Sequence, residues 1–159
     1  MMKLTRASLY ALHAVTYMAA QKDREGGSVA SHVIAQDRGI PERFLLKVLK
    51  PLVAAQILIS VKGPNGGYRL ARPAKEISML EIVEAVDGQI RGSVPFDDFN
   101  EFAKRSRDQG SELSAEQLRK QYDRIQVLHK RLEQVCTPTA EQLRKLLERV
   151  KISELAAKG

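Results

Sequence analysis

Three glycines and a proline lie between two short apolar runs in the stretch Ile59 to Leu70, which reads ISVKGPNGGYRL. Lys62 precedes this turn and Arg69 follows it, so small residues and two cations gather in one place. Such a loop cradles a phosphate when a helix follows it, because the helix N-terminus presents free N–H groups. Here no Gly-Lys-Ser/Thr sequence follows the glycines, and a strand-like run comes next. The stretch therefore predicts a tight β-hairpin turn, where glycine tolerates positive φ, and not a nucleotide-binding loop.

A hairpin tip this small and basic suits the minor groove of DNA, whose negative potential attracts Arg and Lys. Lys62 and Asn65 lie at the predicted tip, and Arg69 lies in the strand that follows. Tyr68 is predicted to pack within the hairpin. The alternative for the tip is an exposed hairpin whose lysine is only solvated.

A second group of cations falls on one side of a helix that is predicted to begin at Pro41. Its buried stripe is expected to comprise Phe44, Leu45, Val48, Leu49 and Leu52. Arg43 lies on the opposite side, where it could bond guanine O6 and N7 and discriminate by about 1–3 kcal/mol. A phosphate contact or simple solvation is equally open for Arg43. Lys47 is predicted to contact the groove or a phosphate, with simple solvation equally open. Arg6, at the start of an earlier helix, is predicted to clamp a phosphate.

The sequence shows no motif that indicates a catalytic site. His13, His32 and His129 fall in different predicted elements, and no nucleophile–base or paired-carboxylate pattern stands out. Cys136 is the single cysteine, which excludes an internal disulfide and a structural zinc site built from several cysteines. We therefore predict that the protein is not an enzyme and that it holds no metal or cofactor.

Composition favours nucleic acid as the partner. The chain has 159 residues, a formal net charge of +7 and a sequence pI near 9.7. This balance indicates DNA as a partner more strongly than an anionic membrane. No apolar run approaches the roughly 20 residues that a membrane span needs, and one unpaired cysteine fits a reducing cytosol. We expect a cytoplasmic protein without a membrane partner.

The elements that must position these cations follow the order of a winged helix-turn-helix. Helices are predicted at 4–20, with Thr5 as the N-cap, at 30–37 and from Pro41, and strands at 57–61 and 68–70. The capping-box spacing recurs at Ser78 with Glu81, Ser114 with Gln117, and Thr139 with Gln142. These pairs predict helices that end near residues 87, 135 and 150. The fold class is thus mainly α with a small β-hairpin wing and a long helix.

The long helix carries an apolar seam that predicts a homodimer. Leu118, Ile125 and Leu132 recur every seven residues, flanked by Tyr122, Leu128 and Val135, which is the pattern of a helix that meets a partner helix. His129 and Cys136 lie beside the seam and are expected to pack there. A thiol sensor or an intersubunit disulfide at Cys136 remains the alternative.

The chain divides into a predicted DNA-binding domain at 1–88, a variable loop at 89–113, and dimerisation and C-terminal helices at 114–159. Phe96, Phe99 and Phe102 are spaced by three within the loop. They predict a short helix that covers apolar surface. The alternative is an effector pocket for an unknown small molecule.

Several motifs in this order resemble the Rrf2 family of bacterial transcription regulators. They are Lys3 to Arg6, Leu9 to Leu12, Pro41 to Leu46, Ser60 to Tyr68, Leu70 to Pro73 and the stretch Ile77 to Gly88. The resemblance implies a homodimeric, sequence-specific regulator, expected to be a repressor, on a near-palindromic operator. Its recognition helices would enter successive major grooves, with the wings in the flanking minor grooves. A non-specific architectural DNA binder is the alternative.

Two departures from the family pattern change what is expected. Some members hold an iron–sulfur cluster with three cysteines in the loop before the long helix, but residues 89–113 contain no cysteine. No cluster is therefore expected here. The Ala-Gly that often closes the family's recognition helix is Ala55-Gln56, so Gln56 is predicted to occupy a strained C-cap position.

Overall fold

The computed structural model describes residues 4–21 and 27–156, which form two compact units. The first unit runs to Ile90 and resumes at Arg144, and the second comprises residues 91–143. Most described residues are helical, and one two-stranded antiparallel sheet accompanies them. The predicted fold class, mainly α with a β-hairpin wing, is confirmed. Within the described ranges, no helix has the length and apolarity required to cross a membrane.

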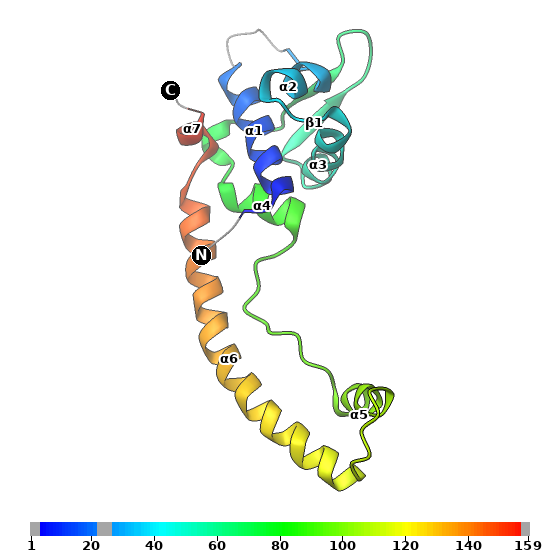
Figure 1. The fold of residues 1–159 in the computed structure, drawn as a ribbon. Coiled ribbons are helices and arrows are strands. Elements are labelled where there is room, and N and C mark those ends of the chain that lie inside the picture. Colours follow the sequence, from blue (N-terminus) through cyan, green and yellow to red (C-terminus); the bar gives the residue numbers. More distant parts are fainter. Residues whose placement is uncertain (1–3, 22–26, 157–159) are drawn as a thin grey trace. The chain divides into compact units, whose positions relative to one another are not determined.

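The first unit surrounds an apolar core of described residues, and Figure 1 shows the helices and strands that form this unit. Its elements are α1 (Arg6–Ala20), α2 (Ser31–Arg38), α3 (Glu42–Ala54), β1 (Leu58–Val61), β2 (Gly67–Leu70), a 3-10 turn (Ala74–Glu76), α4 (Met79–Asp87) and α7 (Ile152–Leu155). Helix α1 contacts α3, α4 and α7, which explains why Ala11, Ala14 and Val15 have no exposed surface. The loop predicted between the first two helices lies largely outside the described residues.

Local sequence signals set the start of several helices. The Thr5 hydroxyl accepts the backbone N–H of Ser8 at 3.0 Å, so Thr5 caps α1 as predicted. Gly39, at a φ of 61°, closes α2. Helix α3 begins one residue later than expected, at Glu42, because Pro41 keeps an extended ψ and acts as the N-cap.

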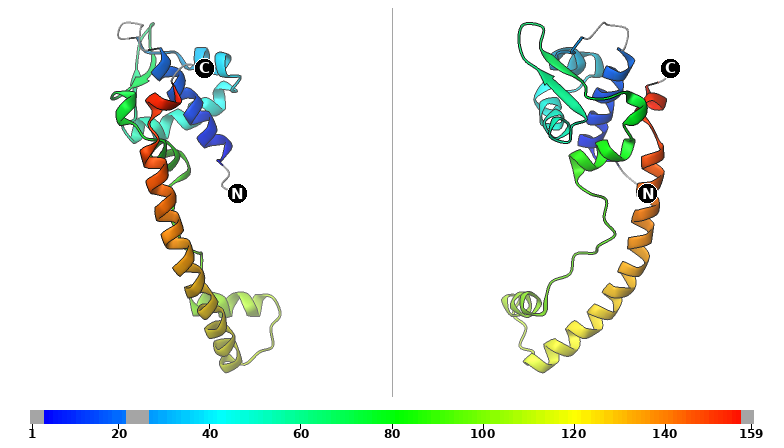
Figure 2. Two further views of the ribbon diagram at one scale, coloured as in Figure 1. Left: turned by 90° about the vertical axis from the view of Figure 1, so that its left-hand side faces the viewer. Right: turned by 180° about the vertical axis from the view of Figure 1, so that it is seen from behind.

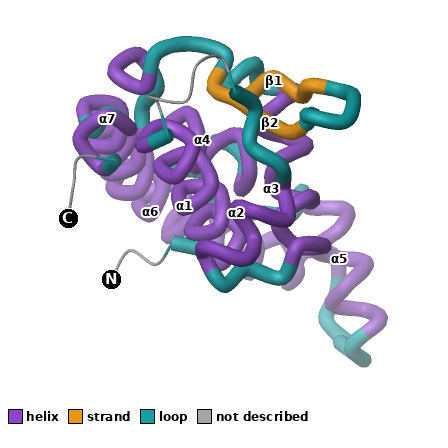
Figure 3. Tube along the Cα trace, turned by 90° about the horizontal axis from the view of Figure 1, so that it is seen from above, coloured by secondary structure: helices purple, strands orange, loops and turns teal. Residues whose placement is uncertain are grey.

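The hairpin projects from the helices at one side of the unit (Figures 2 and 3). Its strands pair Leu58 with Leu70 and Val61 with Gly67. A third segment joins this sheet, because Val29 and Tyr68 exchange backbone hydrogen bonds, both of 2.8 Å. Gly67 is required at this junction, since a Cβ there would lie 2.3 Å from the Val29 carbonyl oxygen. The wing is thus a hairpin locked to the segment that precedes α2.

Gln56 connects α3 to β1 with a φ of 57°, and it is the one non-glycine residue of the described chain at positive φ. The strain predicted at Gln56 from the missing glycine is confirmed, but the C-cap of α3 is Ala55 and Gln56 is the residue that follows it. A left-handed conformation costs an L-residue about 1–2 kcal/mol. The Gln56 side chain is exposed, so its packing offsets little of this conformational cost.

Gln56→Gly is therefore expected to stabilise the protein by about 1 kcal/mol, because glycine adopts this φ without strain. In a chain of this length the melting temperature should rise by about 2–4 °C, as measured by thermal denaturation. Ala55→Gly is the matched control, since Ala55 has a φ of −79° and should lose stability with glycine. Equal stability of Gln56→Gly and the parent chain would contradict the strain.

Helix α4 begins with the predicted capping box. The Ser78 backbone N–H donates to the Glu81 carboxylate at 2.8 Å, and the Ser78 hydroxyl accepts the Glu81 N–H at 3.2 Å. Partial burial raises the pKa of Glu81, but hydrogen bonds from Ser78 and from the Arg72 guanidinium outweigh it and hold that pKa below its ordinary value. The stability gained from this ionised carboxylate is present above the ordinary carboxyl pKa and is lost as the pH falls through the lowered value.

The second unit contains α5 (Phe99–Asp108) and most of α6 (Ala115–Arg149). Asp98 caps α5 by accepting the N–H groups of Asn100 and Glu101. The rings of Phe96, Phe99 and Phe102 lie 5.2–5.5 Å from the Tyr122 ring, and Phe96 also stacks on His129. The short helix predicted from the three phenylalanines is present, but it begins at Phe99 and leaves Phe96 in the segment before it. All three rings pack against Tyr122 on α6.

A backbone contact holds the segment before α5 against α6. A Cβ on Gly92 would lie 2.3 Å from the Thr137 Cα and 2.4 Å from the Cys136 carbonyl oxygen. Only glycine therefore fits at this position without a shift of the backbone. The segment that starts the second unit is pinned to α6 beside Cys136, whose side chain is partly exposed.

Two sequence-based expectations were wrong, and one element was missed. The long helix does not end near residue 135 and restart at Thr139, because α6 continues through Pro138 and the Thr139 hydroxyl donates to the Val135 carbonyl. Ser114 and Gln117, by contrast, form the predicted reciprocal cap. Phe44, assigned to the buried stripe of α3, is 38% exposed, whereas Leu45, Val48, Leu49 and Leu52 are buried. The short helix α7 was not predicted.

Candidate nucleic-acid interface

Helix α3 separates an apolar side from a basic side. Its four buried residues face the core, and Arg43, Lys47 and Lys50 are all exposed. Successive residues turn by about 100° around an α-helix, so positions 43, 47 and 50 share one face. This face carries the two α3 cations that the sequence assigned to DNA.

The exposed ring of Phe44 organises two of these cations. The Arg43 guanidinium carbon lies 4.7 Å from the ring centroid, and the Lys47 ammonium lies 5.6 Å from the same centroid. Cations held over an aromatic face gain about 0.5–1 kcal/mol at exposed sites. Phe44 therefore limits the freedom of Arg43 and Lys47, a role that the sequence pattern did not reveal.

A side-chain hydrogen bond joins the two helices of the helix-turn-helix. The Ser31 hydroxyl, on the first residue of α2, donates to the carboxylate of Glu42, on the first residue of α3, at 2.7 Å. The bond links the starts of both helices, which lie eleven residues apart in the sequence. Neither residue was singled out from the sequence, because a Ser–Glu pair at this spacing has no local signature.

The wing presents its predicted polar residues to solvent. Lys62 and Asn65 are exposed at the turn, and Arg69 is exposed in β2 opposite Ile59. The Ser28 hydroxyl donates to the Asn65 carbonyl at 2.7 Å, which fixes the tip from outside the hairpin. Tyr68 is partly buried and packs against the core, in agreement with its expected packing role.

Besides the cations on α3 and on the wing, the interface includes a basic residue at the start of α1. Arg6 is exposed between Thr5 and Ser8, whose hydroxyls both donate to the Asp87 carboxylate at the end of α4, at 2.8 and 2.6 Å. Ser8 is fully buried. The backbone that carries Arg6 is thereby anchored to the core of the unit.

The basic residues of this interface carry uncompensated charge. No carboxylate of the described chain forms an ion pair with Arg6, Arg43, Lys47, Lys62 or Arg69. They come from α1, α3 and the wing, which all belong to one compact unit. The structure thus brings the cations predicted from the sequence into a single unit without a counter-charge.

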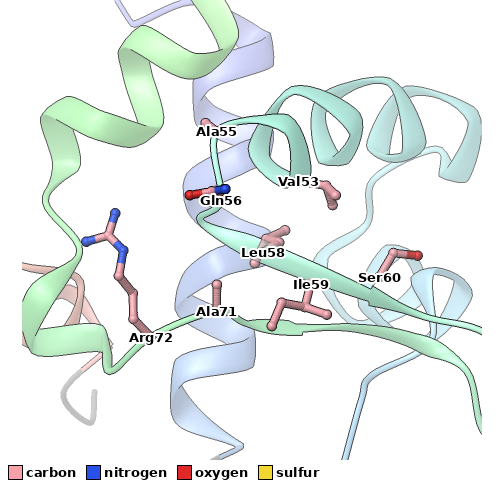
Figure 4. A pocket seen from close by; sticks show the side chains of 8 residues that line it. All are labelled: Val53, Ala55, Gln56, Leu58, Ile59, Ser60, Ala71 and Arg72. Atoms are coloured by element: carbon pink, nitrogen blue, oxygen red, sulfur yellow. The ribbon is translucent and has the colours of Figure 1, made fainter.

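A hollow of about 680 Å³ lies beside the base of the wing (Figure 4). Val53, Ala55 and Gln56 line it near the end of α3, and strand residues and Arg72 complete it. Arg72 is the one cation among the described residues that line it, and that guanidinium already donates to the Glu76 carbonyl and to the Glu81 carboxylate. This hollow therefore offers an anion no free charge.

The predicted dimer seam divides into two parts in the second unit. Leu118 and Tyr122 are buried, at 0% and 7% exposure. The Tyr122 ring contacts the three phenylalanine rings described above. The other four seam residues are exposed: Ile125, Leu128, Leu132 and Val135. An apolar face on α6 is therefore open from residue 125 onward.

Comparisons with known proteins agree with this geometry. The family model Rrf2, described as an iron-dependent transcriptional regulator, matches residues 4–158. Protein aau3 of Rhizobium meliloti is 39% identical over 88 residues, which is 54% of either chain. The HTH-type transcriptional regulator IscR of Cereibacter sphaeroides is 41% identical over 88 residues, 54% of this chain and 56% of that protein. The chain spans about half the length of the curated relatives it matches.

Solved structures share the fold at lower sequence identity. CymR, the global cysteine regulator of B. subtilis, superposes with a TM-score of 0.65 at 20% identity and covers 99% of this chain and 98% of its own. IscR of T. potens gives a TM-score of 0.56 at 19% identity, over 97% of this chain and 85% of its own. At such identities the likeness shows the fold.

Proposed function

Since the chain belongs to the Rrf2 family of transcriptional regulators, we propose that it binds a near-palindromic operator sequence-specifically as a homodimer. The family resemblance inferred from the sequence motifs is confirmed. The observation that supports this function best is the set of uncompensated cations on α3, on the wing and at the start of α1.

Each cation suits a different part of duplex DNA. Recognition helices contact base edges with the residues near their N-terminus, and Arg43 is the second residue of α3. The wing tip with Lys62 and Asn65 suits the minor groove, while Arg6, Lys47 and Arg69 suit phosphates. We assign base recognition to Arg43 and groove or phosphate anchoring to the others.

Arg43→Ala tests the base-reading part of this assignment. Loss of a bidentate contact to guanine should cost about 1–3 kcal/mol and relax preference at one position of each half-site. Selection of bound sequences from a random duplex pool, with the parent chain beside the variant, measures this change. An unchanged preference would remove Arg43 from sequence recognition, and equal binding of the parent chain to all duplexes would indicate an architectural protein.

Lys62→Ala tests the wing. A lost phosphate or groove anchor should weaken binding to all sequences and reduce the salt dependence of the affinity by about one unit of slope. Lys75→Ala is a suitable control, because Lys75 is equally exposed but lies in the 3-10 turn outside the interface. DNA titrations at several salt concentrations measure how the affinity depends on salt. An unaltered slope in Lys62→Ala would show that Lys62 of the wing does not contact DNA.

The donor atoms of this chain do not fit an iron–sulfur cluster, although the family is described as iron-dependent. Cluster irons are held chiefly by thiolates, and Cys136 is the single cysteine. It lies on α6, and no group of three or more His, Cys, Asp or Glu able to hold a metal occurs among the described residues. We propose that the protein regulates without a cluster. Anaerobic purification should yield a colourless protein, and stoichiometric iron and sulfide would overturn this.

A further inference from the structure

A second hollow, of about 380 Å³, lies between the first turns of α1 and α3. Arg6, Ala7 and Tyr10 line it from α1, and Phe44, Lys47 and Val48 line it from α3. Phe44, which is 38% exposed, and the small residue Ala7 both line this hollow. The volume falls in the range of about 300–1,000 Å³ that is usual for small-molecule sites.

The lining of this hollow defines the chemistry of a ligand. Tyr10, Phe44 and Val48 supply apolar walls, and Arg6 and Lys47 are the charged side chains that line it among the described residues. Among the residues that the structure describes, no acidic residue contributes to the lining, and neither cation has an ion-pair partner. A complementary molecule has an apolar body and one anionic end.

We propose that this hollow binds small organic carboxylates with an aromatic or aliphatic body, and that they compete with DNA. The second part rests on the proposed function, which assigns Arg6 and Lys47 to phosphates. A carboxylate seated between these cations would occupy the charges that DNA requires. Its body would lie on the ring that positions Arg43 and Lys47.

The first experiment needs neither DNA nor a variant. Calorimetric titration of the full chain with 2-naphthoate and octanoate is compared with their uncharged amides. The acids should bind about tenfold or more tightly than the amides, because contacts with charged groups contribute more than neutral ones. Equal binding of acid and amide, or no binding of either acid, would overturn the proposal.

Ala7→Met locates the bound molecule, since a longer side chain at this position fills the hollow and leaves both cations in place. Binding of the acids should fall at least tenfold, whereas Ala54→Met, on the exposed end of α3, should bind them like the parent chain. Circular dichroism checks that both variants fold. If folded Ala7→Met binds the acids unchanged, the ligand lies elsewhere and the proposal is wrong.

Competition is measured on DNA selected by the parent chain. At an acid concentration about nine times its dissociation constant, the apparent dissociation constant for DNA should rise about tenfold for each hollow that must be empty, which is about 100-fold for a homodimer with one hollow in each subunit. If an acid binds the hollow but leaves the affinity for DNA unchanged, the proposed competition is wrong. Failure of the chain to bind any duplex would refute the proposed function, while the titration without DNA still decides whether the hollow is a carboxylate site.

Discussion

Ile125→Glu combined with Leu132→Glu is expected to convert the protein to a monomer and to weaken operator binding by about 100-fold or more. Both side chains lie on the open apolar face of α6, at 39% and 42% exposure, so the folded chain can accept glutamate there. Charges on this face would have to be desolvated in a dimer. A monomer also loses the high effective concentration with which a second subunit meets the second half-site, an advantage of about 10²–10⁴.

The matched control places two glutamates on the opposite side of α6. Val127→Glu with Gln134→Glu keeps the seven-residue spacing but rotates both charges by about 200° around the helix. Light scattering at micromolar concentration should show a dimer for this control and the parent chain, and a monomer for the seam variant. A dimeric seam variant, or a monomeric control, would mean that the face from residue 125 onward does not join two subunits.

Gly67→Ala is expected to destabilise the wing by about 3 kcal/mol. The added Cβ would lie 2.3 Å from the Val29 carbonyl oxygen, and the φ of 152° disfavours alanine as well. Strain of this kind costs about 1–3 kcal/mol, and the two hydrogen bonds between Val29 and Tyr68 would add about 0.5–1.5 kcal/mol each if they break. The melting temperature should fall by roughly 10 °C.

Gly63→Ala is the control that separates the two effects of Gly67→Ala, which are the steric contact with Val29 and the strain of a positive φ. Gly63 also has a positive φ, of 110°, but nothing lies within 4 Å of a Cβ added there. Its substitution should therefore cost only the conformational strain, and hydrogen exchange of the Tyr68 amide should remain slow. Equal losses of stability in both variants would show that the contact with Val29 contributes nothing to the wing.

The wing and the cap of α1 were predictable because their signals are local. Glycines between strand-like runs specify a hairpin, and Thr5 before an apolar helix specifies a cap. Both signals depend on a few neighbouring residues, and the sequence contains all of them. The strain at Gln56 was predictable in another way, because the family resemblance implied a glycine where this chain has glutamine.

The errors arose where a distant residue decides the outcome. Phe44 lies at the flank of the α3 stripe, and whether it is covered depends on the packing of other helices, which the local pattern does not contain. The Thr139 and Gln142 pair has capping-box spacing, but the same threonine can donate to the Val135 carbonyl inside a continuing helix. The Val29 and Tyr68 pairing, likewise, joins residues that no local pattern connects.

The left-handed conformation of Gln56 also affects how many destabilising substitutions this chain can tolerate. A typical destabilising substitution costs about 1 kcal/mol, which is close to what glycine at this position should restore. A chain that carries Gln56→Gly would then tolerate a destabilising change that the parent chain cannot. Libraries that vary Arg43, Lys47 and Lys50 to redirect the operator preference should therefore yield more folded members on the glycine background.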